Sequence, residues 1–272
     1  SVTDHQATGA GVEAVLSDGR RIRARLMVGA DGRGSGVAAR AGIRRQGWDY
    51  GQTALVTAIA HDRPHEGIAQ QYFMATGPLA ILPLPGNRSS VVWSETHDNA
   101  RAIAALDDEA FLDVLRPRFG DYLGRISLAG ARFTYPLSLS LAERYAADRV
   151  ALVGDAAHGV HPIAGQGLNL GLRDVAALAE VLVDAARRGE DIGSELVLER
   201  YQGWRRFDAT ALALGMDGVN RLFGSDNPLL SAARGIGMGL VTAVPALRRG
   251  FMRQAAGLAV EPMPRLLTGQ PL

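Results

Sequence analysis

The stretch RVALVGDAAHGVHPIAGQGLNLGLRDVAALAEVLVDAARRG, residues 149–189, has the pattern of a strand, a glycine-rich loop and a long helix. The apolar triplet Ala151-Leu152-Val153 predicts a strand that is buried on both faces. Gly154 allows a sharp turn directly after this strand. Asp155 is therefore expected at the C-terminal end of the strand, the edge at which open α/β sheets bind their ligands.

The second half of this stretch has the period of a helix that begins near Leu168 and ends before Gly189. A glycine-rich loop that leads into a helix presents backbone N–H groups and the positive end of the helix dipole. With a carboxylate at the strand end, this arrangement suits a ligand that has a polyol arm and an anionic or carbonyl-rich head, such as a flavin. A tight connection without a ligand is the alternative. The apolar positions of the helix are Leu172, Val175, Ala176, Ala179, Leu182, Val183 and Ala186.

Two segments resemble the flavin motifs of a known family. The segment GDAAHGVHPIAGQGLNLGLRD, residues 154–174, closely resembles the second flavin motif of the single-component FAD-dependent aromatic hydroxylases. The segment GADGRGS, residues 29–35, resembles the G-A-D-G-x-x-S motif of the same superfamily. Within it, the chain is most similar to the ubiquinone-biosynthesis flavin hydroxylases, or polyprenylphenol hydroxylases. The resemblance implies an α/β fold of the para-hydroxybenzoate-hydroxylase type, with an inserted mixed β-sheet and a helical C-terminal region.

The resemblance also implies which residues contact the cofactor. The aspartate of the first motif is expected near the pyrophosphate and riboflavin part of FAD, in a segment that also affects binding of reduced nicotinamide. Asp155 is expected to bind the ribityl hydroxyls, and backbone dipoles near Gly167 to stabilise anionic reduced flavin at N1. His158 and His161 are placed near the isoalloxazine by motif position alone, and no catalytic residue is assigned. The expected cofactor-binding residues are Gly29, Ala30, Asp31, Gly32, Ser35, Gly154, Asp155, Pro162, Ala164, Gly165, Gly167, Leu168 and Asn169.

The activity that the resemblance implies is hydroxylation of an aromatic ring by an FAD-dependent monooxygenase. Such an enzyme uses NAD(P)H and O₂ and works through a flavin C4a-hydroperoxide. The expected substrate is a polyprenylated phenol of ubiquinone biosynthesis. The cofactor carries the difficult chemistry, while the protein binds, orients and excludes water.

One feature of the family is not found in residues 1–272. The family begins with a strand, a G-x-G-x-x-G turn and a helix that hold the ADP half of FAD. Residues 9–14 and 34–39 fit G-x-G-x-x-A, but neither first glycine lies at the turn after a strand, as the fingerprint requires. We therefore expect residues 1–272 alone to bind FAD weakly or not at all and not to hydroxylate. A catalytically silent flavin-fold fragment or binding module is the alternative function.

A composition shift near Gln46 predicts a division of the chain into domains. We predict a partial FAD-binding domain from residues 1–44 and 143–225, a substrate-binding β-sheet domain from 45–142, and a C-terminal helical tail from 226–272. In the first part, runs 12–16 and 20–28 flank Ser17-Asp18-Gly19, which predicts a hairpin. From Pro228 to Leu272 there are five arginines and one acidic residue, Glu261, so the tail is expected on a membrane surface or a partner of a biosynthetic complex, or packed as helices on the flavin domain.

The middle of the chain has short β-rich runs separated by Pro and Gly. We expect Tyr72, Phe73 and Trp93 either to line an apolar substrate pocket or to pack within the sheet, and packing is favoured for each. The spacing of apolar residues after Gly189 predicts a further amphipathic helix over residues 196–214. The runs predicted as strands are 53–60, 69–74, 79–84 and 89–94, followed by one or two helices over 98–119 and a strand pair over 125–139.

Composition narrows the classes of function. The 272 residues include no cysteine, which excludes disulfides, thiolate metal sites and cysteine nucleophiles. A formal net charge of +1 gives no indication of nucleic-acid binding. Neither a signal sequence nor an apolar run of membrane-spanning length is found, so we expect a cytoplasmic location, with peripheral attachment at the inner face of a membrane. A homo-oligomer is left open.

Two histidine patterns give a competing interpretation. Asp155, His158 and His161 form D-x-x-H-x-x-H, and His61 and His65 are four residues apart. The first pattern lies in a loop, where helical periodicity cannot align the ligands, and a proline interrupts the second. A metal-dependent hydrolase that uses the first pattern is the remote alternative, and no metal is expected.

Overall fold

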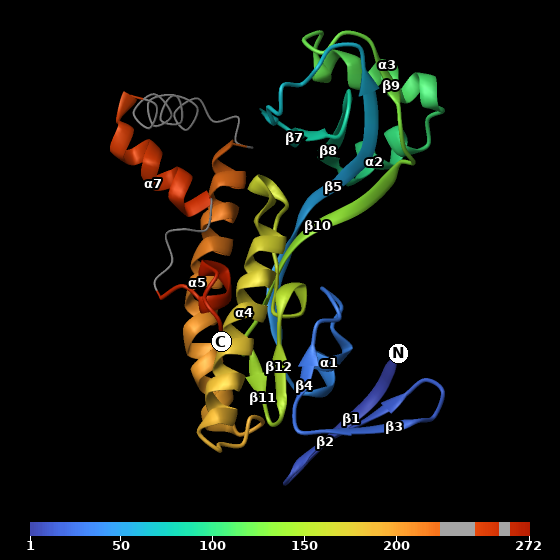
Figure 1. The fold of residues 1–272 in the computed structure, drawn as a ribbon. Helices are drawn as coiled ribbons and strands as arrows, with labels where there is room; N and C mark the ends of the chain where they lie inside the picture. Colours follow the sequence, from blue (N-terminus) through green and yellow to red (C-terminus); the bar gives the residue numbers. More distant parts are fainter. Residues whose placement is uncertain (224–242, 256–261) are drawn as a thin grey trace. The chain divides into compact units, whose positions relative to one another are not determined.

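The computed structural model describes residues 1–223, 243–255 and 262–272 (Figure 1). The chain divides into two compact units. Unit 1 comprises Ser1–Trp48, Leu139–Asp217 and Gly239–Leu272, and unit 2 comprises Asp49–Ser138 and Gly218–Met238. Two long strands, β5 (Arg45–His61) and β10 (Phe133–Ala142), each contribute residues to both units.

The first sheet of unit 1 is an antiparallel ribbon. It has the order β1-β2-β3, with β1 at Val2–Thr8, β2 at Gly11–Leu16 and β3 at Arg21–Ala24. The predicted hairpin is confirmed, because β2 and β3 flank the turn at Ser17-Asp18-Gly19.

The prediction of a single strand over residues 20–28 is wrong. The run contains β3, which pairs with β2, and β4 (Met27–Gly29), which pairs in parallel with β12 (Val150–Leu152). A long-range contact causes the break. The buried guanidinium of Arg149 donates to the Arg25 carbonyl at 3.1 Å, and the Met27 N–H donates to the Arg149 carbonyl at 2.9 Å. The chain therefore leaves one sheet and enters another.

The second sheet of unit 1 brings the two motif segments together. Its order is β11-β12-β4, with β11 at Ala146–Ala147. Because Leu152 lies opposite Gly29 in the parallel register, both strands end at the same edge. A Cβ on Gly29 would lie 2.8 Å from Leu152 Cδ2, so glycine is needed for this close approach. All residues of β12 are buried, which confirms the predicted strand after Arg149.

Two long helices accompany this sheet in unit 1 (Figure 1). Helix α4 (Gln166–Arg187) begins slightly before the predicted start, and Gly189, at φ 72°, follows it as predicted. Helix α5 (Glu195–Phe223) extends beyond the predicted 196–214. A short helix η3 (Arg265–Thr268) is attached to α4 by the Arg265 N–H, which donates to Glu180 Oε2 at 2.7 Å.

The C-terminal tail is described only in part. Helix α7 (Pro245–Ala255) exposes every side chain that the structure describes within it. Of the predicted tail, residues 226–242 and 256–261 lie outside the described residues.

Unit 2 is an antiparallel sheet with two helices on one face. Its strands follow the order β5-β8-β7-β6, with β6 at Gln70–Met74, β7 at Gly77–Leu84 and β8 at Arg88–Thr96. Helices α2 (His97–Ala104) and α3 (Asp108–Phe119) confirm the helical prediction for 98–119, and the side chains of Thr96 and Asp107 cap their N-termini. The core cluster includes Leu55, Ile59, Leu79, Ile81, Val91, Trp93, Phe111, Leu115 and Phe119.

The predicted strand pair over residues 125–139 needs a correction. Both strands exist, as β9 (Ile126–Leu128) and β10, but each is hydrogen-bonded to β5 rather than to the other. The physical reason is the length of β5, which at 17 residues offers one partner edge long enough for both. Sequence alone predicted only its apolar second half, 53–60.

Candidate functional site

Two turns lie where β4 and β12 end, and each contains an aspartate. We call residues 29–35 the Asp31 turn and the 3₁₀ turn η1 (Gly154–Ala156) the Asp155 turn. Parallel pairing of the two strands places both turns at the C-terminal edge of one sheet. This is the edge at which α/β sheets bind ligands.

The Asp31 turn is closed by its own hydrogen bonds. Asp31 Oδ1 accepts from Ser35 Oγ at 2.5 Å, and Oδ2 accepts from the Val37 N–H at 3.0 Å. Ser35 Oγ in turn accepts from the Ala38 N–H at 2.9 Å and caps helix α1 (Gly36–Arg40). Burial raises the pKa of Asp31, but these hydrogen bonds outweigh it and hold the pKa below its usual value. Both carboxylate oxygens are therefore used within the loop.

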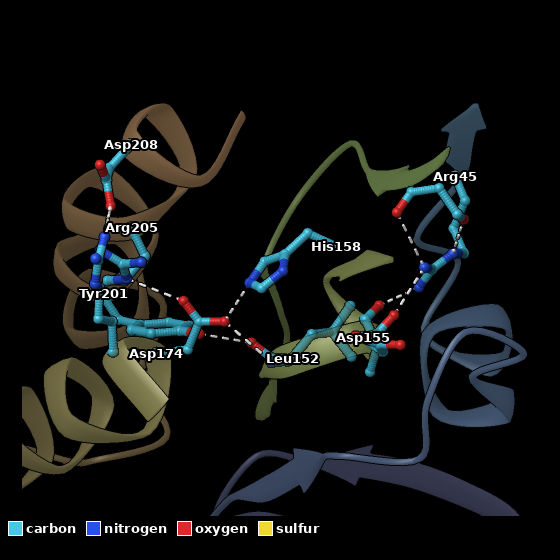
Figure 2. Close-up of polar contacts among 12 residues, drawn as sticks. Arg45, Leu152, Asp155, His158, Asp174, Tyr201, Arg205 and Asp208 are labelled. Carbon is cyan, nitrogen blue, oxygen red and sulfur yellow. Dashed lines mark hydrogen bonds and ion pairs between the residues drawn. The ribbon is translucent and has the colours of Figure 1, made fainter. Parts of the chain in front are cut away.

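The Asp155 turn leaves its carboxylate accessible. The side chain of Asp155 is 43% exposed, and Oδ2 lies 3.2 Å from Arg33 Nε. Arg45 holds the backbone of the same turn, donating to the Asp155 carbonyl at 2.9 Å and also to the Ala156 carbonyl (Figure 2). Burial lowers the pKa of Arg45, against the opposing effect of Asp155. Two arginines thus flank this turn, and sequence reasoning did not identify either of them.

The loop after the Asp155 turn leads to a helix start without a side-chain cap. Gly165, in the left-handed conformation at φ 61°, is the N-cap of α4 and supplies no acceptor to the first turn. Leu168 is 74% exposed and Asn169 is exposed, whereas Gln166 is buried, so one side of the first turn of α4 faces solvent. Pro162 is also exposed, and Ala164 lies in the short helix η2 (Ile163–Gly165). The N–H groups of a helix start, at the positive end of the helix dipole, suit a carbonyl or anionic group.

The two motif histidines are buried, and they have different partners. His158 Nε2 lies 2.5 Å from Asp174 Oδ2 on α4 (Figure 2). His161 Nδ1 accepts from the Ile163 N–H at 3.1 Å. Burial, with a smaller contribution from Arg33, lowers the pKa of His161 to about 4. Both imidazole rings therefore point into the protein interior, and their positions in the motif do not predict this orientation.

Neither histidine pattern brings a set of metal ligands together among the described residues. Asp155 pairs with Arg33 and His158 with Asp174, so the first histidine pattern does not converge. His61 places Nδ1 2.7 Å from the Arg63 carbonyl and Nε2 3.1 Å from Ser89 Oγ, so both of its nitrogens have partners. Over the described ranges, no three His, Cys, Asp or Glu side chains gather so that they could hold a metal ion.

The three pocket candidates of unit 2 do not share one face of the sheet. Trp93 is fully buried in the core, and its Nε1 donates to Glu95 Oε1 at 3.1 Å. Tyr72 lies opposite Leu79, which lies opposite Trp93, so these side chains point to the same face. Phe73 is the next residue along β6 and therefore points to the other face.

The face of the unit 2 sheet opposite its helices has mainly small apolar side chains. Val56 pairs with Val92, which pairs with Ala80, and all three are half-buried. Ala58 and Ser90 form the next row on the same face. These half-buried side chains form a partly exposed, mainly apolar patch on this face of the sheet.

The family of the chain follows from comparison with known proteins. The FAD binding domain family matches residues 1–213, which contain both turns. The chain belongs to the FAD-dependent aromatic hydroxylase superfamily. Ubiquinone hydroxylase UbiL of Rhodospirillum rubrum is 51% identical over 265 residues, an alignment that covers 96% of this chain and 62% of that protein. The human mitochondrial ubiquinone biosynthesis monooxygenase COQ6 is 34% identical over 279 residues, covering 90% of this chain and 60% of that protein.

Comparison with solved structures bears on the fold of the chain. The p-nitrophenol 4-monooxygenase PnpA of Pseudomonas putida DLL-E4 superimposes with a TM-score of 0.77 at 20% identity, covering 97% of this chain and 67% of that one. This similarity confirms the predicted fold class. The chain spans about three fifths of the length of the curated relatives it matches.

Proposed function

We propose that the protein containing this chain is an FAD-dependent monooxygenase that hydroxylates a polyprenylated phenol in ubiquinone biosynthesis, with NAD(P)H and O₂ as co-substrates. The observation that carries the proposal is the pairing of two motif turns at one sheet edge, beside a helix start without a side-chain cap. The names of the similar ubiquinone hydroxylases support the substrate class.

The residues present fit the chemical groups of FAD. The exposed carboxylate of Asp155 can accept hydrogen bonds from the ribityl hydroxyls. The first turn of α4 offers N–H groups and a positive dipole to the N1–C2=O edge of the flavin. Positive φ at Gly154 and Gly165 lets the backbone approach a ligand where a larger residue would be strained.

The chain's own residues bind and orient, whereas bound FAD supplies the redox chemistry. The α4 dipole would stabilise negative charge that develops at the flavin N1. His161, with a pKa of about 4, stays uncharged near neutral pH and adds no positive charge to this loop. The small apolar side chains of the unit 2 sheet, such as Val56 and Val92, would contact the aromatic ring or prenyl chain.

The test of this proposal is a spectrum followed by an assay. The full-length protein should show flavin absorbance after purification or after addition of FAD. With a polyprenylphenol, it should oxidise NAD(P)H and release a ring-hydroxylated product that mass spectrometry detects. Failure to bind FAD would contradict the proposal. Binding of FAD without NAD(P)H oxidation across a panel of phenols would favour the binding-module alternative.

We also propose that α7 lies on an anionic membrane surface, where a polyprenylated substrate would dissolve. Its sequence, PALRRGFMRQA, contains three arginines and no acidic residue, and its described side chains are exposed. Within the part of the chain that the structure describes, no helix is long and apolar enough to cross a membrane. Surface attachment through basic and apolar side chains needs no such helix.

Vesicle co-sedimentation tests the role of α7. Each arginine near an anionic surface contributes about 1 kcal/mol, so the triple variant R248Q/R249Q/R253Q should lose binding to vesicles with anionic lipid. The control variant R20Q/R21Q/R23Q removes the same charge from the hairpin of unit 1 and should bind like wild type. Equal loss in both variants would show that net charge, not α7, drives attachment.

A further inference from the structure

Asp174 is an acidic residue with no access to solvent, on the side of α4 that faces the Asp155 turn (Figure 2). Its exposed fraction is 0%. Oδ2 accepts from the Gly154 N–H at 3.0 Å and lies 2.5 Å from His158 Nε2, while Oδ1 accepts from Arg205 Nε at 2.9 Å. A buried carboxylate must have such partners, and here they come from the turn, the loop and helix α5.

The charges around Asp174 balance. Arg205 also donates to Asp208 Oδ2 at 2.8 Å, and Arg173 lies 3.7 Å from the same oxygen. Two arginines therefore lie beside two aspartates, so each acidic side chain of this cluster has a cationic partner. With Nε2–H as the donor to Asp174, the ring is fixed by this one hydrogen bond, because Nδ1 has no partner among the described residues.

The backbone at the end of β12 is held by side chains from outside the turn. The lack of side chains at Gly154 and Gly171 allows helix α4 to lie close to the turn, since a Cβ on Gly171 would lie 3.3 Å from Gly154 Cα. Helix α4 can thus approach closely enough for Asp174 to reach the turn. The contacts are Tyr201 Oη to the Leu152 carbonyl at 2.7 Å, Asp174 to the Gly154 N–H, and Arg45 to the carbonyls of Asp155 and Ala156.

Because these contacts hold the backbone of the turn, the Asp155 carboxylate is the group of the turn that is left to exchange its partner, Arg33, for a ligand hydroxyl. We propose that Asp174 is a positioning residue, which sets the direction of the Asp155 carboxylate toward the ribityl chain without contacting the ligand. His158 and Arg205 act through Asp174, by fixing the orientation of its carboxylate. This inference rests on the proposed FAD-binding function.

A purely structural role for Asp174 makes different predictions from a positioning role. In the full-length protein, D174N keeps the side-chain shape but replaces one acceptor oxygen with an NH₂ group, which cannot accept from Gly154, His158 or Arg205. Partners that orient the ligands of a metal site change metal affinity by about ten- to a hundredfold, and we expect an effect of similar size for the positioning of Asp155. We expect the FAD dissociation constant of D174N to rise by this factor, and that of riboflavin, which has the same ribityl chain, to rise equally.

The matched control is D191N. Asp191 accepts from Arg149 at 3.1 and 2.6 Å and from the Gly193 N–H at 3.1 Å, so it is also an anchored acidic residue of unit 1. It has no contact with the Asp155 turn among those described for it. D191N should lower the thermal midpoint and leave FAD affinity unchanged at a temperature where it is folded.

A double-mutant cycle decides whether Asp174 acts through Asp155. In the D155A background, D174N should weaken FAD binding no further, because the carboxylate that it positions is gone. If D174N does not fold, H158F and H158Q replace it. H158F should weaken binding, and H158Q, whose amide can still donate to Asp174, should restore most of it.

Each outcome has a distinct meaning. Weakening by D174N alone, absent in D191N and absent in the D155A background, supports the proposal. Equal effects in D174N and D191N, or full additivity with D155A, would overturn it while FAD binding by wild type still supports the proposed function. Failure of wild type to bind FAD or riboflavin would overturn the proposed function, and the positioning role with it.

Discussion

The two turns at the sheet edge each contain an aspartate shortly after the end of a strand, but the two aspartates differ in what they contact. Asp31 has both oxygens engaged by Ser35 and Val37 within its own loop. Asp155 has its backbone held by other elements, while its carboxylate stays 43% exposed beside Arg33. The surroundings of an aspartate therefore decide whether it stabilises its own loop or leaves its carboxylate exposed.

The largest expected effect is a loss of folding stability at acidic pH, which the two turns should undergo in different pH ranges. The loop after the Asp155 turn contains His161, whose folded pKa of about 4 lies below the ordinary value of 6.5. Between these values the unfolded chain binds a proton that the folded chain does not, so stability falls as pH is lowered from 6.5 to 4. Integrated over this window, the loss is about 3 kcal/mol.

Urea unfolding of wild type and H161N at several pH values checks this prediction. Asparagine cannot titrate, yet its carbonyl can still accept from the Ile163 N–H, so H161N should flatten the pH dependence above pH 4. The pKa of the Asp31 carboxyl is lowered by its hydrogen bonds. The stability that Asp31 contributes should therefore be lost only at lower pH, as its carboxylate becomes protonated. Identical pH profiles for wild type and H161N would contradict the role assigned to His161.

The next effect concerns the structural role of Asp31. D31A removes the acceptor of the Ser35 hydroxyl and of the Val37 N–H, and should lower the free energy of unfolding by about 2 kcal/mol. D155A removes an exposed side chain and should change it by no more than about 0.5 kcal/mol. Chemical denaturation measures both. A larger loss in D155A than in D31A would reverse the comparison.

A smaller effect is expected at the helix cap of the Asp31 turn. S35A removes the acceptor of the Ala38 N–H and should destabilise the protein by about 1 kcal/mol. S35T retains the hydroxyl and should remain close to wild type. Thermal unfolding of the pair distinguishes loss of the cap from a general effect of substitution, which would appear in both variants.

The local parts of this site could be predicted from sequence. The apolar triplet before Gly154 and the helical period after Leu168 are contained within short windows, and β12 and α4 agree with them. Flavin motifs at both strand ends were identified for the same reason. The family assignment and the fold class were therefore within reach of the sequence.

The long-range parts could not be predicted. The break between β3 and β4 depends on the side chain of Arg149, far along the chain, and no local pattern at Arg25 indicates it. Arg45 donates to carbonyls of the Asp155 turn, a contact that any arginine could make and no motif specifies. His158 turns toward Asp174 because a buried carboxylate needs donors, which a motif position does not reveal.

We propose that Asp155 binds the cofactor, whereas Asp31 stabilises its own loop. A titration of FAD into full-length wild type, D155A and D31A, at a temperature where all three are folded, compares the two roles. Loss of a charge-assisted hydrogen bond costs about 1.5–3 kcal/mol, so D155A should bind FAD about ten- to a hundredfold more weakly, and D31A should lose clearly less. Unchanged affinity in D155A together with a large loss in D31A would contradict the account.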